Sequence, residues 1–154
     1  MVLSHTSDEH EWFKNSKKQD ANKYSDWYVW TDGKPNTPPN NWLSVFGGSS
    51  WKWHDERDQF YLHNFLTSQP DLNFHNEEVQ QQMLDEIEYW LKFGVDGFRF
   101  DVINFLYHDS ALRDNPAKDP KLVRPLGFNK DNPYGLQIHK SVSYTHLRAH
   151  ETPI

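Results

Sequence analysis

The sequence predicts an α/β fold, because a helical pattern leads directly into a strand pattern. Between residues 76 and 94, apolar side chains recur at the spacing of one helix face. Between residues 97 and 104, side chains alternate in character, as they do along a strand. Ahead of both, residues 6–73 are rich in aromatic residues, proline and glycine. We therefore expect a strand–helix–strand unit of a parallel sheet that carries a β-rich insertion.

The insertion is predicted to contain a short helix, an extended stretch and a hairpin. Residues 9–18 read as the helix, and residues 24–30 as an aromatic, extended stretch. Glycine and proline punctuate residues 31–50, which predicts a loop. Alternating residues on both sides of a polar turn at 55–58 predict a hairpin over residues 51–65.

The predicted main helix has clear signals at both ends. Asn76 is a residue type that caps helix N-termini well, and carboxylates follow it in the first turn. Gly94 fits the position just past the helix C-terminus. The apolar stripe between them is expected to pack on the outside of a parallel sheet. Its members are Val79, Met83, Leu84, Ile87, Trp90 and Leu91.

The strand that follows has one apolar and one charged face. Arg99 and Asp101 fall on one side, and Phe98 and Phe100 on the other. An ordinary ion pair on an exposed edge strand would explain the two charges. The leading helix and the place of Asp101 near the strand end favour a catalytic role, because catalytic groups of parallel α/β barrels sit at the C-terminal strand ends.

Composition limits the function classes. The chain has 154 residues, a net charge of −6 and no cysteine, so a nucleic-acid partner, disulfides and thiolate metal sites are not expected. Aromatic residues make up 16%, which suits either a rich core or a sugar-binding surface. No apolar run is long enough to span a membrane and no signal peptide opens the chain, so we expect no membrane partner and a cytoplasmic location.

The sequence Gly-Phe-Arg-Phe-Asp at residues 97–101 resembles the nucleophile strand of glycoside hydrolase family 13, the α-amylase family. The sequence Gln-Pro-Asp-Leu-Asn at residues 69–73 resembles a fingerprint of its bacterial α-glucosidase and oligo-1,6-glucosidase branch. The resemblance implies a (β/α)8 TIM barrel. Because a complete barrel needs about 250 residues, the chain is expected to be a fragment.

The resemblance also divides the chain. Residues 1–5 would end barrel strand 3, residues 6–73 would form the inserted B domain, and residues 74–104 would form barrel helix 3 and strand 4. Residues 105–140 would be the loop after strand 4. Residues 141–154 look like translated sequencing adaptor, and we expect them to be a non-native tail.

Three site residues follow from the resemblance. Asp101 is implied as the nucleophile, Arg99 as its electrostatic partner, and His5 as a contact to the sugar. A cation two residues back on the same strand face favours the ionised carboxylate that a nucleophile needs. Ser4 stands where the family usually has an asparagine that binds calcium in amylases, so no metal and no cofactor are expected.

The implied activity is that of a retaining, exo-acting α-glucosidase. It would hydrolyse short α-glucosides of the maltose or isomaltose type through a covalent glycosyl-enzyme on Asp101. Val102 is the residue type seen beside the nucleophile in relatives that accept α-1,6 linkages. The family's acid/base glutamate follows the fifth barrel strand, so we expect the fragment itself to be inactive. A non-catalytic scaffold of this family and a carbohydrate-binding protein remain the alternatives.

Overall fold

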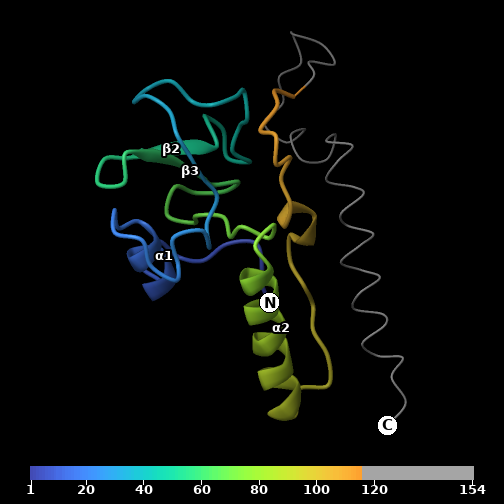
Figure 1. Cartoon of the computed structure of the whole chain (residues 1–154). Coiled ribbons are helices and arrows are strands. Elements are labelled where there is room, and N and C mark those ends of the chain that lie inside the picture. The colour runs from blue at the N-terminus through green and yellow to red at the C-terminus, as the bar shows by residue number, and fades with distance from the viewer. Residues whose placement is uncertain (116–154) are drawn as a thin grey trace.

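The computed structural model describes residues 1–115 of the chain (Figure 1). Beyond them lie most of the loop predicted for residues 105–140 and the whole tail predicted for residues 141–154, so these two predictions fall wholly or largely outside the described residues. In chain order the elements are α1 (Glu11–Ser16), β1 (Trp30–Thr31), β2 (Trp51–His54), β3 (Gln59–Leu62), α2 (Glu77–Lys92) and the 3-10 helix η1 (Ile103–Phe105).

The insertion forms a small antiparallel sheet with the strand order β1-β3-β2. The predicted hairpin is confirmed as β2 and β3, with Trp51 opposite Leu62 and Trp53 opposite Phe60. The polar turn between them ends at Asp58, which has a φ of 58°. Local alternation and a turn of polar residues were sufficient to predict this unit.

Two other predictions for the insertion need adjustment. The first helix is shorter than residues 9–18, because α1 covers only Glu11–Ser16 and the His10 side chain accepts from the backbone N–H of Trp12 at its start. The stretch of residues 24–30 is not extended throughout, because residues 23–26 form a turn. The Asn22 side chain accepts from the backbone N–H of Tyr24, a local bond that competes with strand formation.

Most of the aromatic residues of the insertion, residues 6–73, are core, as predicted. One buried cluster joins the N-terminal residues, the insertion and the start of α2. Its members are Leu3, Phe13, Trp27, Tyr28, Tyr61, Leu72, Phe74, Val79, Met83 and Leu106. A second cluster lies within the insertion and consists of Val29, Trp42, Trp51, Phe60 and Leu62.

Helix α2 has both of the predicted ends. The Asn76 side chain accepts from the backbone N–H of Glu78 at 2.9 Å, which satisfies an N-terminal donor. At the other end, Gly94 has a φ of 102°, and the N–H groups of Gly94 and Val95 bond to the carbonyls of Leu91 and Trp90. This pair of bonds is the Schellman arrangement, which glycine adopts at little cost.

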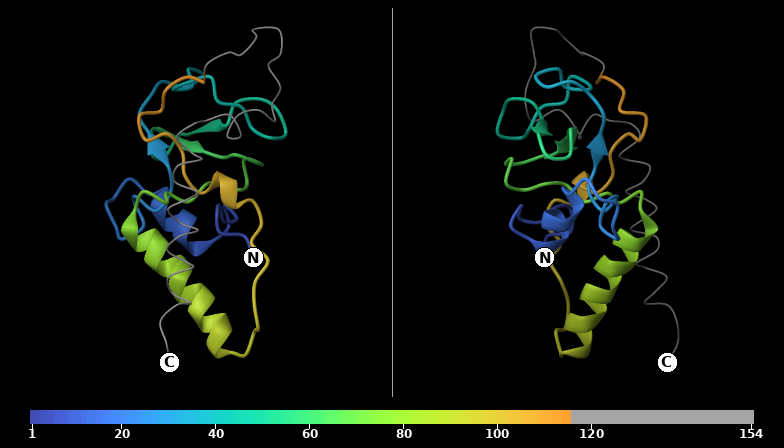
Figure 2. Two further views of the ribbon diagram at one scale, coloured as in Figure 1. Left: turned by 90° about the vertical axis from the view of Figure 1, so that its right-hand side faces the viewer. Right: turned by 60° about the vertical axis from the view of Figure 1, so that its left-hand side comes forward.

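The packing stripe of α2 was predicted too long. Val79 and Met83 are buried, but Leu84, Trp90 and Leu91 are exposed within the described residues. In Figures 1 and 2 the second half of α2 projects away from the insertion. Helical periodicity shows which side chains share a face, but it does not show how much of that face a neighbour covers.

The predicted regular strand over residues 97–104 is wrong. In the described residues, this stretch has only one strand-like pair, a parallel bridge between Asp101 and Val2. Val102 has a φ of 49° and η1 begins at the next residue, so the alternation ends at Asp101. A strand needs backbone partners along its length, and here only residues 99–101 have them.

Candidate active site

The first residues of the chain lie against the Arg-x-Asp segment. The backbone N–H of Asp101 donates to the Met1 carbonyl at 2.9 Å, and the amino terminus donates to the Arg99 carbonyl at 2.7 Å. With the parallel Val2–Asp101 bridge, these bonds set two short stretches side by side in the same direction. The predicted parallel neighbourhood of the two strand ends is therefore present, although neither stretch is a regular strand.

The two predicted catalytic side chains do share a face. An Nη atom of Arg99 lies 3.6 Å from a carboxylate oxygen of Asp101. On the opposite side, the rings of Phe98 and Phe100 stack with centroids 5.6 Å apart. Both charged side chains are open to solvent, with 88% of Arg99 and 56% of Asp101 exposed. At such exposure an ion pair contributes at most about 1 kcal/mol.

His5 is held through both ring nitrogens. Its Nδ1 lies 2.9 Å from the Ser4 hydroxyl, and its Nε2 lies 3.2 Å from the amide nitrogen of Gln69. Partial burial lowers the pKa of His5, which favours the neutral ring. His5 is three residues beyond Val2, so its backbone lies within about 10 Å of the residue that pairs with Asp101.

A cavity of about 340 Å³ opens beside His5. It is lined by the first residues of the chain and by the segment at the end of the insertion. The lining residues are Val2, His5, Thr6, Ser7, Leu66, Ser68 and Gln69.

Phe65 lies next to the candidate site, which the sequence did not reveal. Its ring centroid lies 5.1 Å from that of His5 and 5.0 Å from that of Phe105, just after Asp101. The exposed Phe46 lies 6.2 Å from it on the other side. Phe65 thus joins the His5 region to the segment after Asp101. Its place at the end of the predicted hairpin gave no signal of this, because the contacts are with residues far apart in the sequence.

The Gln-Pro-Asp-Leu-Asn segment, residues 69–73, is held in place at the end of the insertion by hydrogen bonds. Asp71 is buried, and its carboxylate accepts from both the backbone and side-chain N–H groups of Asn64. Burial raises the pKa of Asp71 well above its usual value, although the bonds from Asn64 act the other way. The backbone of Leu72 donates to the Ser4 carbonyl at 2.9 Å, which ties this segment to the His5 stretch.

The segment after η1 is fastened to the insertion by a short clamp, which we define as residues 40–42. The side chain of Asn41 exchanges two hydrogen bonds with the backbone of Asn115, at 3.1 and 2.9 Å. The Trp42 indole donates to the Arg113 carbonyl at 2.9 Å. These bonds span more than 70 positions of sequence, so they fix the docked loop, residues 109–115, against the insertion.

Two further interactions hold this loop. The Asp109 carboxylate accepts from the Arg113 guanidinium at 2.7 and 2.9 Å, and these bonds lower the pKa of Asp109 to about 2. Nearby, His75 donates from Nε2 to the His108 carbonyl at 2.8 Å. Burial lowers the pKa of His108 to about 3, so its ring is neutral at physiological pH.

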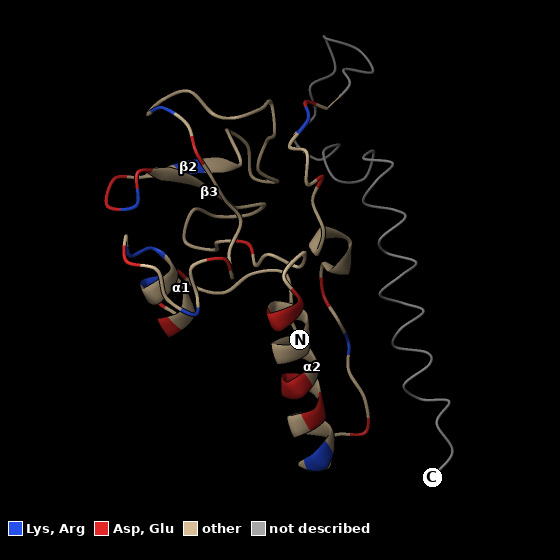
Figure 3. Ribbon diagram, in the orientation of Figure 1, with Lys and Arg blue, Asp and Glu red and all other residues tan. Residues whose placement is uncertain are grey.

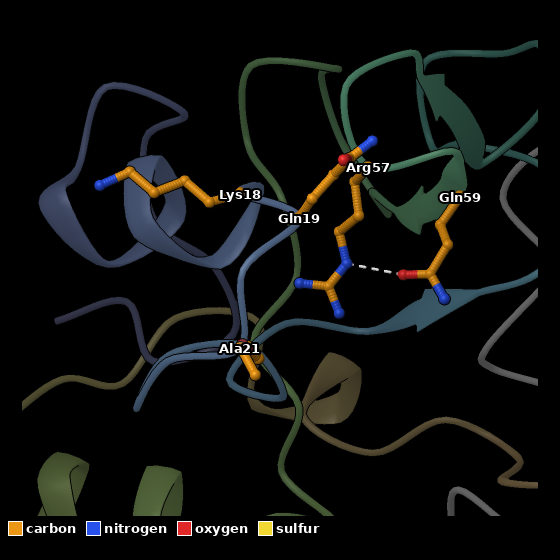
Figure 4. Close-up of a pocket in the computed structure, with 6 residues that line it drawn as sticks. Lys18, Gln19, Ala21, Arg57 and Gln59 are labelled. Carbon is orange, nitrogen blue, oxygen red and sulfur yellow. Dashed lines mark hydrogen bonds between the residues drawn. The ribbon is translucent and has the colours of Figure 1, made fainter.

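A second hollow of about 330 Å³ lies on the insertion and contains Arg57 (Figure 4). The Arg57 Nε donates to Gln59 at 2.6 Å, while another guanidinium nitrogen donates to the Ser16 carbonyl at the end of α1. The guanidinium also lies 4.5 Å from the Trp30 ring centroid, and Phe13 stacks on Trp30 as well. Arg57 is therefore held by structural contacts, and Trp30 packs against both Arg57 and Phe13.

No site in residues 1–115 groups three side chains that could hold a metal ion. In the same part of the chain, no helix is long and apolar enough to cross a membrane. Figure 3 shows acidic residues spaced along α2, where Glu77, Glu78, Asp85, Glu86 and Glu88 occur. This charge pattern would repel a polyanion.

Comparison with known proteins gives clear relatives. A probable alpha-glucosidase of Rhizobium meliloti (strain 1021) is 57% identical over 140 residues, covering 90% of this chain and 25% of the relative. The amino acid transporter heavy chain SLC3A1 of Rattus norvegicus is 49% identical over 117 residues, covering 73% of this chain and 17% of the relative. The chain therefore spans about a quarter or less of the length of these relatives.

A solved structure agrees with the sequence matches. The alpha-glucosyl transfer enzyme XgtA has 58% sequence identity and a TM-score of 0.75, covering 86% of this chain and 25% of that one. The model of the alpha-amylase catalytic domain matches residues 1–152, which extends into the tail predicted to be non-native. The predicted family and barrel class are confirmed: the chain belongs to the α-amylase family and corresponds to part of its TIM-barrel catalytic domain.

Proposed function

We propose that this chain supplies the nucleophile side of the active site of a retaining, exo-acting α-glucosidase. The observation that supports this most directly is the parallel contact between the Arg99–Asp101 pair and the stretch that carries His5. It brings a carboxylate, a guanidinium and an imidazole from distant parts of the sequence towards one end of the described structure. The names of the relatives fit this chemistry, since both an alpha-glucosidase and an alpha-glucosyl transfer enzyme are similar to the chain.

The roles of the three residues follow from their chemistry. Asp101 would attack the anomeric carbon and form the glycosyl-enzyme, which water then hydrolyses. Arg99, 3.6 Å away, would favour the anionic carboxylate. His5 would bind a sugar hydroxyl at the rim of the adjoining cavity. The substrate would be a short α-glucoside of the maltose or isomaltose type.

The test is covalent trapping in the protein encoded by the contiguous gene. A slow glucosyl fluoride substrate should leave one glucosyl mass on the peptide that contains Asp101. Asp101→Asn should abolish both the label and the release of p-nitrophenol from p-nitrophenyl α-glucoside. Asp96→Asn removes a carboxylate five residues away and serves as the matched control. Label on another carboxylate would refute the assignment of the nucleophile.

The chain of residues 1–154 alone is expected to be inactive, because no acid/base glutamate can be assigned in it. Retaining glycosidases need two carboxyl groups about 5–5.5 Å apart. Purified chain should therefore release no p-nitrophenol above the level of its Asp101→Asn variant. Turnover that depends on Asp101 would contradict this proposal.

The similarity to a transporter heavy chain favours one other candidate, a non-catalytic scaffold. The Arg-x-Asp geometry argues for the enzyme, since a scaffold has no need of a guanidinium beside an exposed carboxylate. Turnover separates the two, because a scaffold would show no label and no hydrolysis in the whole protein. Product analysis further separates hydrolysis, which releases glucose, from glucosyl transfer to a second sugar.

Linkage preference is expected to follow Val102. Its φ of 49° is unusual for a β-branched residue, so the side chain beside Asp101 is held in a strained backbone conformation. We propose that the whole enzyme cleaves isomaltose faster than maltose. A strong preference for maltose would contradict this part of the proposal.

A further inference from the structure

The ring of His5 lies between two hydrogen-bonding groups of different kinds. The Ser4 hydroxyl at Nδ1 can either donate or accept, because a hydroxyl carries both a proton and lone pairs. The Gln69 amide at Nε2 can do only one of these, depending on which of its two atoms faces the ring. The orientation of the Gln69 amide therefore decides where the imidazole proton sits.

The structure determines that orientation through Leu66. The backbone N–H of Leu66 points at the Gln69 side chain at 3.1 Å, and an N–H group can only donate. The atom that receives this bond must be the amide oxygen. The other atom, which faces His5 at 3.2 Å, is then the NH2 group. An NH2 group can only donate, so Nε2 of His5 must accept and cannot carry a proton.

The support beneath Gln69 keeps this arrangement in place. The Gln69 backbone N–H donates to the Leu66 carbonyl at 2.8 Å, so the two residues bond in both directions. Pro70 follows, and Asp71 is then fixed by buried bonds from Asn64. Since the backbone on both sides of Gln69 is restrained, its side chain has little freedom to turn the amide over.

We propose that Gln69 is a positioning residue that holds His5 as the Nδ1–H tautomer, with Nε2 as the acceptor of the bond from the Gln69 NH2 group. The Ser4 hydroxyl then accepts a hydrogen bond from Nδ1–H. Because a hydroxyl can also donate, Ser4 could bond to either tautomer and does not determine which one forms. A protonated imidazolium would place an N–H against the Gln69 NH2 group, so the same contact keeps the ring neutral.

The arrangement limits the contacts that His5 can make with a ligand in the cavity. This step rests on the proposed function, whereas the tautomer does not. While the Gln69 bond is kept, the lone pair of Nε2 is occupied and the only N–H of the ring is directed at Ser4. His5 then presents neither a positive charge nor an N–H group to a carboxylate in the cavity. The arrangement therefore gives a uronic acid no stabilising contact from His5, and a neutral sugar loses nothing by this.

Nitrogen-15 NMR of the 154-residue chain, labelled at histidine, tests the tautomer without any assay of activity. A His5→Asn variant assigns the two ring nitrogens. The wild-type ring is expected to carry its proton on Nδ1 at pH 7. A proton on Nε2, or an even mixture of tautomers, would overturn the proposal. Since this readout needs no substrate, its failure is distinct from failure of the proposed glucosidase activity.

Three variants separate the two partners of the ring. Gln69→Glu keeps the oxygen that Leu66 needs but places a carboxylate oxygen at Nε2, so Nε2 should gain a proton, either in the neutral Nε2–H tautomer or in the imidazolium. Ser4→Ala should leave the imidazole proton on Nδ1, because the Ser4 hydroxyl does not determine the tautomer. Gln19→Glu makes the same change of charge at an exposed residue of the insertion and should change nothing. An Nε2 that stays unprotonated in Gln69→Glu, or a shift of the proton to Nε2 in Ser4→Ala, would refute the role given to Gln69.

Discussion

Removing the side chain of Asn41 should weaken the attachment of the docked loop to the insertion, which would still be held by the Asn40 side chain, the Asn41 backbone N–H and the Trp42 indole. Asn41→Ala deletes the two bonds to the Asn115 backbone, at 3.1 and 2.9 Å. A net hydrogen bond contributes about 0.5–1.5 kcal/mol, and Asn41 is exposed, so the pair is worth about 1–2 kcal/mol. That energy corresponds to a factor of about 5–30 in the equilibrium between the docked and the released loop.

Exchange of the Trp42 indole N–H with deuterium measures this opening. The indole bonds to the Arg113 carbonyl and is not itself changed by Asn41→Ala. If residues 109–115 are released as a unit, the Trp42 indole should exchange faster by the same factor of about 5–30. The Trp30 indole, which donates to the Ser16 hydroxyl within the insertion, is the internal control and should keep its rate.

A second variant tests whether the loss of any exposed asparagine would have the same effect as Asn41→Ala. Asn104→Ala removes an exposed asparagine of η1 and should leave the Trp42 indole unchanged. An unchanged Trp42 rate in Asn41→Ala would refute the reasoning, because the two attachments would then open independently. Faster exchange of both indoles would show instead that the insertion as a whole had loosened.

Three more predictions concern stability. Burial raises the pKa of Asp71, so the folded state holds its proton more tightly and the free energy of unfolding falls as pH rises through that pKa. Asp71→Asn cannot ionise and keeps an oxygen for one of the two bonds from Asn64, so it should remove this slope in urea titrations between pH 4 and 8 while lowering stability at every pH. The lowered pKa of Asp109, about 2, gives stability that is full above its ordinary value of 3.8 and lost as pH falls towards 2. Asp109→Asn should therefore lower the free energy of unfolding by about 1 kcal/mol at neutral pH and leave it unchanged below pH 2. The value is small because the partner arginine is half exposed. Gly94→Ala should cost about 1–2 kcal/mol in thermal unfolding because of the φ of 102°, while Gly97→Ala, whose added methyl meets no neighbour, should cost less.

Elements with local causes were predicted well from the sequence. The ends of α2 depend on Asn76 and Gly94, and each acts on backbone groups within a few residues. The hairpin depends on alternation and on a turn that closes within four residues. The shared face of Arg99 and Asp101 depends only on the geometry of an extended chain, and the ion pair at 3.6 Å follows from it.

Features with distant causes could not be predicted in the same way. The segment of residues 97–104 has strand periodicity but too few backbone partners in the described residues. Residues 97–102 are irregular apart from the bridge at Asp101, and the last two residues belong to η1. The role of Phe65 comes from rings placed by residues 5 and 105. In the sequence, the clamp at residues 40–42 looks like an ordinary part of a polar loop. Its function as a clamp could not be predicted, because its partners lie more than 70 positions away. Periodicity contains no information on such partners.

The exposure of the Arg99–Asp101 pair links the geometry to the expected inactivity of the chain. At 3.6 Å, two unit charges attract by about 1 kcal/mol in water and by about 4–5 kcal/mol at an effective dielectric constant near 20. With 88% of the guanidinium exposed, the first value applies to the described structure. A cleft that excludes water would move the pair towards the second value and strengthen the hold on the carboxylate. The two charges therefore lie close together in this chain, but the described residues do not supply the low-dielectric surroundings in which Arg99 would act strongly on Asp101.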